Sequence, residues 1–268
     1  ALSVSVEDAD AQTDAEQALF GEPGMPAPKE GWQRSRIIAL FANETLAQEA
    51  AEILPQQDFF AGCQQLDLRA VEEQDWVRLT QSQFAPVEVT PTFWIVPTWH
   101  EPPAQATTII RLDPGLAFGT GTHPTTHMCL RWIATHSDLG TVLDYGCGSG
   151  ILAIGAMKFG ASNAIAVDID PPAIEATQQN AADNGVTLQA GMPELAQGQF
   201  NVVIANILAT PLKVLAPLLC SHIAAGGHLV LAGILERQAD ELIAAYAPYV
   251  QLRVTDSQDG WILMTAHR

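Results

Sequence analysis

The chain has 268 residues, of which 48% are apolar and 16% charged, and 30 acidic against 12 basic residues give a formal charge of −18. This composition supports a substantial core and excludes a disordered chain. The negative field repels phosphate backbones and anionic membranes, so it disfavours nucleic-acid and membrane-surface roles and favours a basic protein partner. A contribution to solubility alone explains the acidic excess equally well.

Cysteine usage and the N-terminus bear on the compartment. The four cysteines form no CxxC pair and predict neither a zinc site nor a disulfide framework; they are Cys63, Cys129, Cys147 and Cys220. Free thiols are typical of a reducing cytoplasm. No signal peptide is visible, and prolines, a lysine and a glycine pair interrupt the apolar stretch Val202–Leu235, which argues against a membrane span. We expect a cytoplasmic protein without a metal.

The first part of the chain mixes strand and helix patterns. We predict strands at Leu2–Val6, Arg36–Phe41 and Cys63–Ala70, and a helix at Thr45–Leu54 that ends before a proline. A loop rich in proline and glycine, Gly21–Gly31, separates the first two strands. The charged segment Glu72–Gln83 is predicted to be a helical connector between domains.

From about Val87 strand-like runs alternate with helical stretches, which predicts βαβ units and a mostly parallel, doubly wound sheet. The predicted strands are Thr141–Asp144, Ala164–Asp168, Val202–Ala205 and His228–Ala232, and the predicted helices are Ile151–Phe159, Pro171–Asn184, Leu208–Ile223 and Arg237–Tyr246. Two further runs, Tyr249–Thr255 and Trp261–Ala266, are joined through Asp259-Gly260, a tight-turn signal. The expected fold class is therefore α/β, with an antiparallel hairpin that closes the sheet.

The most informative segment is the glycine loop, defined here as residues 144–150, Asp-Tyr-Gly-Cys-Gly-Ser-Gly. An apolar strand runs directly into Gly146, Gly148 and Gly150, and a helix follows at once. Glycines allow a sharp turn and a close approach of ligand to backbone. The helix start offers N–H groups to a ligand. This context indicates a nucleoside-binding site.

Asp168 ends the next predicted strand, at the distance after the loop where an acidic residue accepts hydrogen bonds from ribose hydroxyls. The alternative is a helix cap, but Asp170 precedes a proline and is better placed for that role. The GxGxG spacing differs from the GxGxxG of dinucleotide sites, and Asp144 suits a cationic ligand better than a pyrophosphate. S-adenosylmethionine meets these requirements, although the spacing alone leaves a nicotinamide cofactor open.

A second motif lies upstream, at residues 112–126, Leu-Asp-Pro-Gly-Leu-Ala-Phe-Gly-Thr-Gly-Thr-His-Pro-Thr-Thr. So many turn-forming residues and hydroxyls predict an ordered loop that leads into a helix at about Pro124. Thr125 and Thr126 then lie near the N-terminus of that helix, where hydroxyls and N–H groups can hold a carboxylate. A well-capped helix after a long turn is the alternative interpretation.

Four blocks of the chain together resemble the ribosomal protein L11 methyltransferase family. The run from Asp113 to Thr126 is similar to that family's signature almost residue for residue. The glycine loop with the following Ile-Leu-Ala-Ile, the Asp-Ile-Asp-Pro run from Asp168 and the Asn-Ile-Leu-Ala run from Asn206 match in order. The resemblance extends from roughly Ile37 to the end.

The resemblance implies a seven-stranded methyltransferase domain at residues 87–268, behind a linker at 69–86 and a small α/β substrate-recognition domain at 1–68. That small domain is ferredoxin-like in the family, and this chain lacks its expected first strand and helix. The cofactor is implied to be S-adenosylmethionine, and the activity to be methylation of lysine ε-amines and the N-terminal α-amine of ribosomal protein L11. The implied and predicted cofactor-binding residues are Phe118, Gly119, Thr126, Asp144, Gly146, Gly148, Asp168 and Asn206.

The chemistry requires a neutral amine in line with the sulfonium methyl. Alignment is worth up to roughly 7–11 kcal/mol. Deprotonating a lysine ε-amine at about pH 7.4 costs about 4 kcal/mol, whereas deprotonating an α-amine costs less than about 1 kcal/mol. A site that accepts lysine must therefore lower its pKa or remove its proton through water.

Asn206 is the predicted catalytic residue, because it closes a strand at the carboxyl edge of the sheet and its carbonyl oxygen can accept an amine N–H. Amine methyltransferases often have Asn-Pro-Pro-aromatic at this place, whereas this chain has Asn-Ile-Leu. The alternative for Asn206 is the N-cap of the next helix. His123 is a further candidate for a general base, although a histidine beside a proline is as often structural.

Three alternative functions stay open on the sequence. A nucleoside-binding protein without transfer activity would keep the glycine loop, and a nicotinamide-dependent oxidoreductase would use it for a dinucleotide. Within methyltransferases, another protein or a small amine is the competing substrate.

Overall fold

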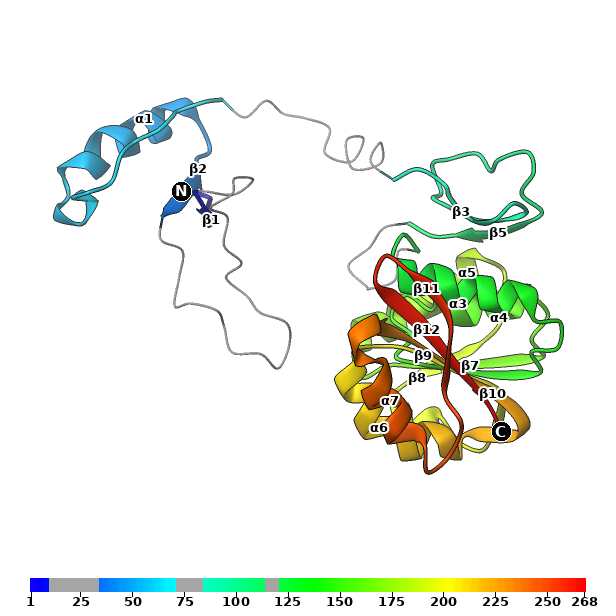
Figure 1. Cartoon of the computed structure of the whole chain (residues 1–268). Coiled ribbons are helices and arrows are strands. Elements are labelled where there is room, and N and C mark those ends of the chain that lie inside the picture. Colours follow the sequence, from blue (N-terminus) through cyan, green and yellow to red (C-terminus); the bar gives the residue numbers. More distant parts are fainter. Residues whose placement is uncertain (10–33, 71–83, 114–120) are drawn as a thin grey trace. The chain divides into compact units, whose positions relative to one another are not determined.

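The computed structural model describes residues 1–9, 34–70, 84–113 and 121–268 (Figure 1). The chain divides into two compact units, Ala1–Gln74 and Asp75–Arg268. Among the described helices, none has the length and apolar character that a bilayer crossing requires. The predicted loop at 21–31 and the predicted connector at 72–83 lie outside the described residues.

The first unit contains a two-stranded antiparallel sheet and one helix. The strands are β1 (Ser3–Asp8) and β2 (Ser35–Leu40). The helix α1 (Glu44–Ile53) begins where the Asn43 side chain accepts a hydrogen bond from Leu46 N at 3.0 Å. Two short 3-10 turns, Leu54–Gln56 and Asp58–Phe60, follow it. These elements confirm the first two predicted strands and the predicted helix.

The third predicted strand of this unit is wrong, because Cys63–Ala70 has no regular secondary structure. Leu66 and Leu68 alternate with polar residues as a strand would, but their side chains are 67% and 45% exposed. No described strand pairs with this segment. Alternation alone does not make a strand when no neighbouring ladder satisfies its backbone groups.

The second unit is built on a seven-stranded sheet in the order β11-β12-β10-β9-β6-β7-β8. Its strands are β6 (Thr141–Tyr145), β7 (Asn163–Val167), β8 (Gln189–Gly191), β9 (Phe200–Asn206), β10 (Ile223–Leu235), β11 (Arg253–Gln258) and β12 (Trp261–His267). Strands β6 to β10 are parallel, and β12 is antiparallel to both β10 and β11. The turn between β11 and β12 has positive φ at Asp259 and Gly260. The predicted α/β class and the closing hairpin are confirmed.

Helices cover both faces of this sheet (Figure 1). Their bounds are α3 (Pro124–Thr135), α4 (Ile151–Lys158), α5 (Pro171–Asp183), α6 (Ala209–Ser221) and α7 (Ala239–Tyr246). Successive side chains of β6 enter opposite cores: Val142 packs with residues of α3 and α4, and Leu143 packs with residues of α6 and α7. Because side chains alternate along a strand, Asp144 faces the α3 and α4 side.

A three-stranded sheet that the sequence analysis did not predict covers α3 and α4. Its strands are β3 (Val87–Thr90), β4 (Phe93–Val96) and β5 (Thr108–Arg111). Phe93 and Ile110 are buried in the same core as Ile154 of α4. Asn184, at the end of α5, accepts from Arg111 N at 2.8 Å and donates to Arg111 O at 2.7 Å. The strand before the second motif is therefore fixed to the helix layer of the large sheet.

Candidate cofactor and amine site

The candidate site lies at the carboxyl edge of the large sheet, around β6, the middle one of its five parallel strands. The chain runs outward from β6 through β7 to β8, then returns to the other side of β6 with β9 and β10. The strand order therefore reverses between β6 and β9, where open α/β sheets bind their ligands. The glycine loop follows β6 at this edge, Asp168 follows β7, and Asn206 ends β9.

The glycine loop is held by hydrogen bonds within the protein. Gly146 N and Cys147 N both donate to Val167 O, at 2.8 and 3.0 Å, and Gly150 N donates to Cys147 O at 2.8 Å. Thr177 Oγ1 of α5 donates to Gly148 O at 3.0 Å. With these loop amides bonded internally, the loop offers few donors to a pyrophosphate, which disfavours the nicotinamide alternative.

Asp168 ties the glycine loop to the start of α5. One carboxylate oxygen accepts from Gly148 N at 2.9 Å, and the other accepts from Asp170 N at 3.1 Å. A carboxylate has about four acceptor sites, so two stay available for ribose hydroxyls. Asp170 occupies the N-cap position of α5, as expected, but its side chain makes no capping hydrogen bond.

Asp144 is fully buried beneath the glycine loop. Its Oδ2 accepts a hydrogen bond from Ala153 N, the third amide of α4, at 3.0 Å. Asp144 thus caps α4 in place of the N-cap residue Gly150, which has no side chain. Its Oδ1 is buried and has no hydrogen-bond partner. Burial raises the pKa of Asp144 to about 7; the hydrogen bond from Ala153 lowers this pKa and the charge of Asp168 raises it. An unpartnered buried carboxylate oxygen fits a ligand that brings a positive charge or a donor.

Asn206 and Thr126 meet across the site. Asn206 Nδ2 lies 3.4 Å from Thr126 Oγ1, so the first turn of α3 reaches the end of β9. Thr126 is 1% exposed, and Thr125 is equally buried. The alternative role of Asn206 as a helix cap is wrong, because Leu208 is the N-cap of α6. The carbonyl of the Asn206 side chain is thus not engaged in capping.

His123 serves as the N-cap of α3. Its ring nitrogen Nδ1 accepts from Thr125 N at 3.3 Å and lies 2.8 Å from Thr125 Oγ1. The ring also packs edge-on against Trp261 at a centroid distance of 4.8 Å, and burial lowers its pKa. This geometry gives His123 a structural role and supplies no reason to make it the general base.

Phe118 and Gly119 lie outside the described residues, so their predicted contact with the cofactor stays a prediction. The second motif is anchored just before them, because the Asp113 carboxylate accepts from Thr98 N and Thr98 Oγ1, each at 2.7 Å. Among the described parts of the chain, no group of three His, Cys, Asp or Glu side chains is arranged to hold a metal ion.

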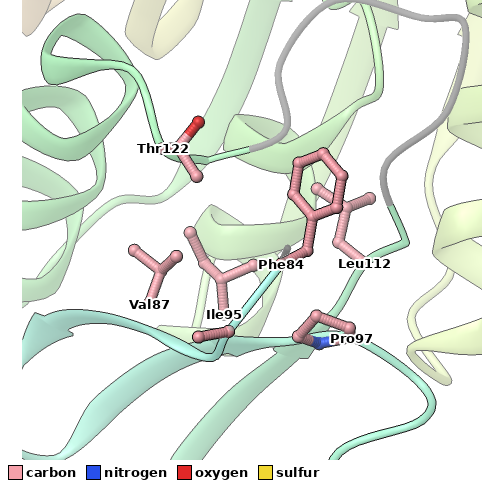
Figure 2. Close-up of a pocket in the computed structure, with 7 residues that line it drawn as sticks. Phe84, Val87, Ile95, Pro97, Leu112 and Thr122 are labelled. Atoms are coloured by element: carbon pink, nitrogen blue, oxygen red, sulfur yellow. The ribbon is translucent and has the colours of Figure 1, made fainter. Parts of the chain in front are cut away.

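A small apolar pocket lies on the β4 side of this region (Figure 2). Its lining contains no charged side chain, so it is not a site for a charged cofactor. The lining residues are Phe84, Ala85, Val87, Ile95, Pro97, Leu112 and Thr122.

The sequence analysis gave no role to two residues beside Asn206, which are Ile207 and Gly233. Ile207 fills space that side chains at Gly146 and Gly233 would otherwise occupy. The available signal was Gly233 itself, an isolated glycine within an apolar run, which is typical of a bulge or a close backbone approach.

Comparisons with known proteins show which family this chain resembles. The family model described as ribosomal protein L11 methyltransferase (PrmA) matches residues 1–268. A Polaromonas sp. protein named ribosomal protein L11 methyltransferase is 72% identical over 99% of this chain and 91% of its own length. A Cupriavidus necator protein of the same name is 50% identical over 100% of this chain and 90% of its own length. The crystal structure of a ribosomal protein L11 methylase from Lactobacillus delbrueckii subsp. bulgaricus has a TM-score of 0.62 at 35% identity, covering 69% of this chain and 99% of that chain.

The raised pKa of Asp144 predicts how the stability of the cofactor-free protein depends on pH. The folded state holds the Asp144 proton up to about pH 7, whereas the unfolded state loses it near the ordinary aspartate pKa of 3.8. Folding stability is therefore lost as the pH rises between these values, by up to roughly 4 kcal/mol. Asp144→Asn keeps an acceptor for Ala153 N and removes the ionisation.

Denaturant unfolding at pH 5 and pH 8 measures this effect. Asp144→Asn should gain stability relative to the unsubstituted protein on going from pH 5 to pH 8, and the exposed Asp170→Asn should not. An equal pH dependence in all three proteins would show that Asp144 is ionised throughout.

Proposed function

Because the chain belongs to the ribosomal protein L11 methyltransferase family, we propose that it transfers methyl groups from S-adenosylmethionine to amino groups of ribosomal protein L11. The acceptors are lysine ε-amines and the N-terminal α-amine. The observation that carries the proposal is the pair of carboxylates at one sheet edge, Asp144 with an unpartnered buried oxygen and Asp168 with open acceptor sites.

The cofactor assignment is supported by the charge of these groups. S-adenosylmethionine supplies a methyl group on a positively charged sulfur, so transfer to a neutral amine leaves a neutral thioether. In our proposal Asp168 accepts from the ribose hydroxyls while it holds the glycine loop. Asp144 provides the negative charge beneath the loop, and Gly148 keeps the loop backbone open to the ligand. The space that a side chain at Gly146 would need is taken by Ile207.

The amine is oriented by Asn206 in this proposal. The Asn206 Nδ2 group lies toward Thr126 Oγ1 at 3.4 Å, which directs the side-chain carbonyl to the other side. That carbonyl accepts a hydrogen bond from an N–H of the incoming amine. This orients the lone pair of the amine nitrogen toward the methyl group. Thr126 thus holds the amide from the first turn of α3.

The substrate assignment is supported by charge as well as by the family. The chain carries −18 at neutral pH, which attracts a basic ribosomal protein and raises the encounter rate. The same field disfavours direct contact with nucleic acid or anionic membranes. We place the enzyme in the cytoplasm, where such a substrate is made.

Mass spectrometry of ribosomal protein L11 tests the proposed reaction. The substrate is purified from cells that lack this enzyme and is incubated with enzyme and S-adenosylmethionine. We expect mass gains in steps of one methyl group. Asn206→Ala should slow transfer by about 100-fold, because the amine loses its alignment. Asp168→Ala should weaken cofactor binding at least about tenfold, and Asp170→Ala is the matched control.

The outcomes separate the parts of the proposal. No mass gain, with cofactor binding retained in calorimetry, would contradict L11 as the substrate. Neither mass gain nor cofactor binding would contradict the methyltransferase assignment itself.

Cofactor binding should also depend on pH through Asp144. The ionised carboxylate favours a cationic ligand, and its population falls below the pKa of about 7. The affinity for S-adenosylmethionine should therefore be roughly fivefold weaker at pH 6 than at pH 7. Calorimetry at the two pH values measures this ratio, and Asp144→Asn should abolish it. A pH-independent affinity in the unsubstituted enzyme would contradict the role given to Asp144.

A further inference from the structure

The turn that follows Asn206 crosses the end of the neighbouring strand β10 at Gly233. Asn206 pairs with Ala232 in the β9–β10 register, so Gly233 is the next residue along β10. A Cβ atom at Gly233 would lie 2.3 Å from Ile207 O, 2.7 Å from Ile207 C and 3.1 Å from Ile207 N. These are backbone atoms, so a rotamer change cannot relieve the overlap. The Ile207 backbone therefore occupies the volume that any side chain at position 233 would need.

The side chain of Ile207 is half-buried and packs against the glycine loop. A Cβ atom at Gly146, the first glycine of the glycine loop, would lie 2.4 Å from Ile207 Cγ2. Ile207 is thus held between the end of β6 and the end of β10, with its backbone against Gly233 and its side chain against Gly146. Since Ile207 is bonded directly to Asn206, these contacts limit where the Asn206 amide lies.

Gly233 sits in a bulge of β10. The β10–β12 pairing runs regularly to Leu231↔Met264 and resumes at Ile234↔Ile262, so the register shifts between them. The φ angle of Gly233 is +82°, in the left-handed region that favours glycine. Bulges re-aim the chain at sheet edges and next to sites. Here the bulge opens the space through which the Ile207 backbone passes.

We propose that Gly233 is a positioning residue for methyl transfer, because its missing side chain lets Ile207 lie against β10 and so fixes Asn206 relative to the reacting amine. This inference rests on the proposed function. A substitution far from the reacting atoms that displaces an aligned group by about 1 Å can lower the rate about 100-fold. Gly233 makes no contact with substrate in this scheme and acts only through Ile207.

Gly226 provides a matched control in the same strand. Its φ angle is +73°, close to that of Gly233, but a Cβ atom there would meet nothing within 4 Å. Alanine at either position has a similar left-handed backbone strain. The two substitutions therefore differ in the contact with Ile207 and not in conformational cost.

The experiment compares Gly233→Ala with Gly226→Ala in the full-length enzyme. With L11 as substrate, Gly233→Ala should reduce kcat about 100-fold relative to Gly226→Ala. The KM for L11 should stay within about threefold, because the docking surface is unchanged, and the calorimetric Kd for S-adenosylmethionine within about tenfold. Gly233→Ala should unfold at a lower temperature than Gly226→Ala, because only its Cβ overlaps the Ile207 backbone, and both variants should be folded at the assay temperature. A loss of kcat matched by an equal loss of folded protein would show a merely structural role and overturn the proposal.

If Gly233→Ala does not fold, a second pair of variants tests the step through which Gly233 acts, the placement of Asn206 by Ile207. Ile207→Ala removes the side chain that packs against Gly146 and should lower kcat about tenfold at unchanged KM. Val214→Ala, a truncation of a 76% exposed side chain on α6, is its control. Equal rates in the two truncations would overturn the proposal.

Failure of the proposed function gives a different result. Unsubstituted enzyme that transfers no methyl group to L11 would contradict the function and this inference together. Unsubstituted enzyme that is active, with Gly233→Ala as fast as Gly226→Ala, would contradict this inference alone.

Discussion

The site depends on a carboxylate buried beneath the glycine loop. Asp144 is fully buried, has one hydrogen bond, from Ala153 N, and leaves Oδ1 without a partner. Such a group is costly when charged, which is why its pKa rises to about 7. It nevertheless caps α4, whose N-cap residue is a glycine. The protein therefore keeps a destabilising group at the point where a cationic cofactor would compensate for it.

Around that carboxylate, each functional group also has a structural bond that sets its position. Asp168 joins the glycine loop to α5, and Asn206 lies against Thr126 at the start of α3. Ile207 lies against Gly146 with its side chain and against Gly233 with its backbone. The groups come from the ends of three strands, β6, β7 and β9. In the proposed reaction, alignment of amine and methyl therefore depends on the packing of the sheet edge and not on one flexible loop.

Most of the large domain could be predicted because its elements have clear periods and turn signals. The strand before Gly146, the helix after Pro171 and the Asp259-Gly260 turn all lie where the sequence placed them. Wrong or missing predictions concern tertiary contacts. The strand predicted at 63–70 has no partner ladder, and the short β3–β5 sheet is defined by its packing on α3 and α4. The contact of Gly233 with the Ile207 backbone joins residues 26 positions apart, which local pattern does not encode.

A crystal structure of the enzyme with S-adenosylmethionine tests the central claim most directly, because it shows which atoms complete the two carboxylates. Our account predicts a cationic or donor group of the cofactor, directly or through one water, on Asp144 Oδ1, with ribose hydroxyls on Asp168. A cofactor bound at this edge while Asp144 Oδ1 stays unpartnered, or a cofactor bound elsewhere in the molecule, would contradict it.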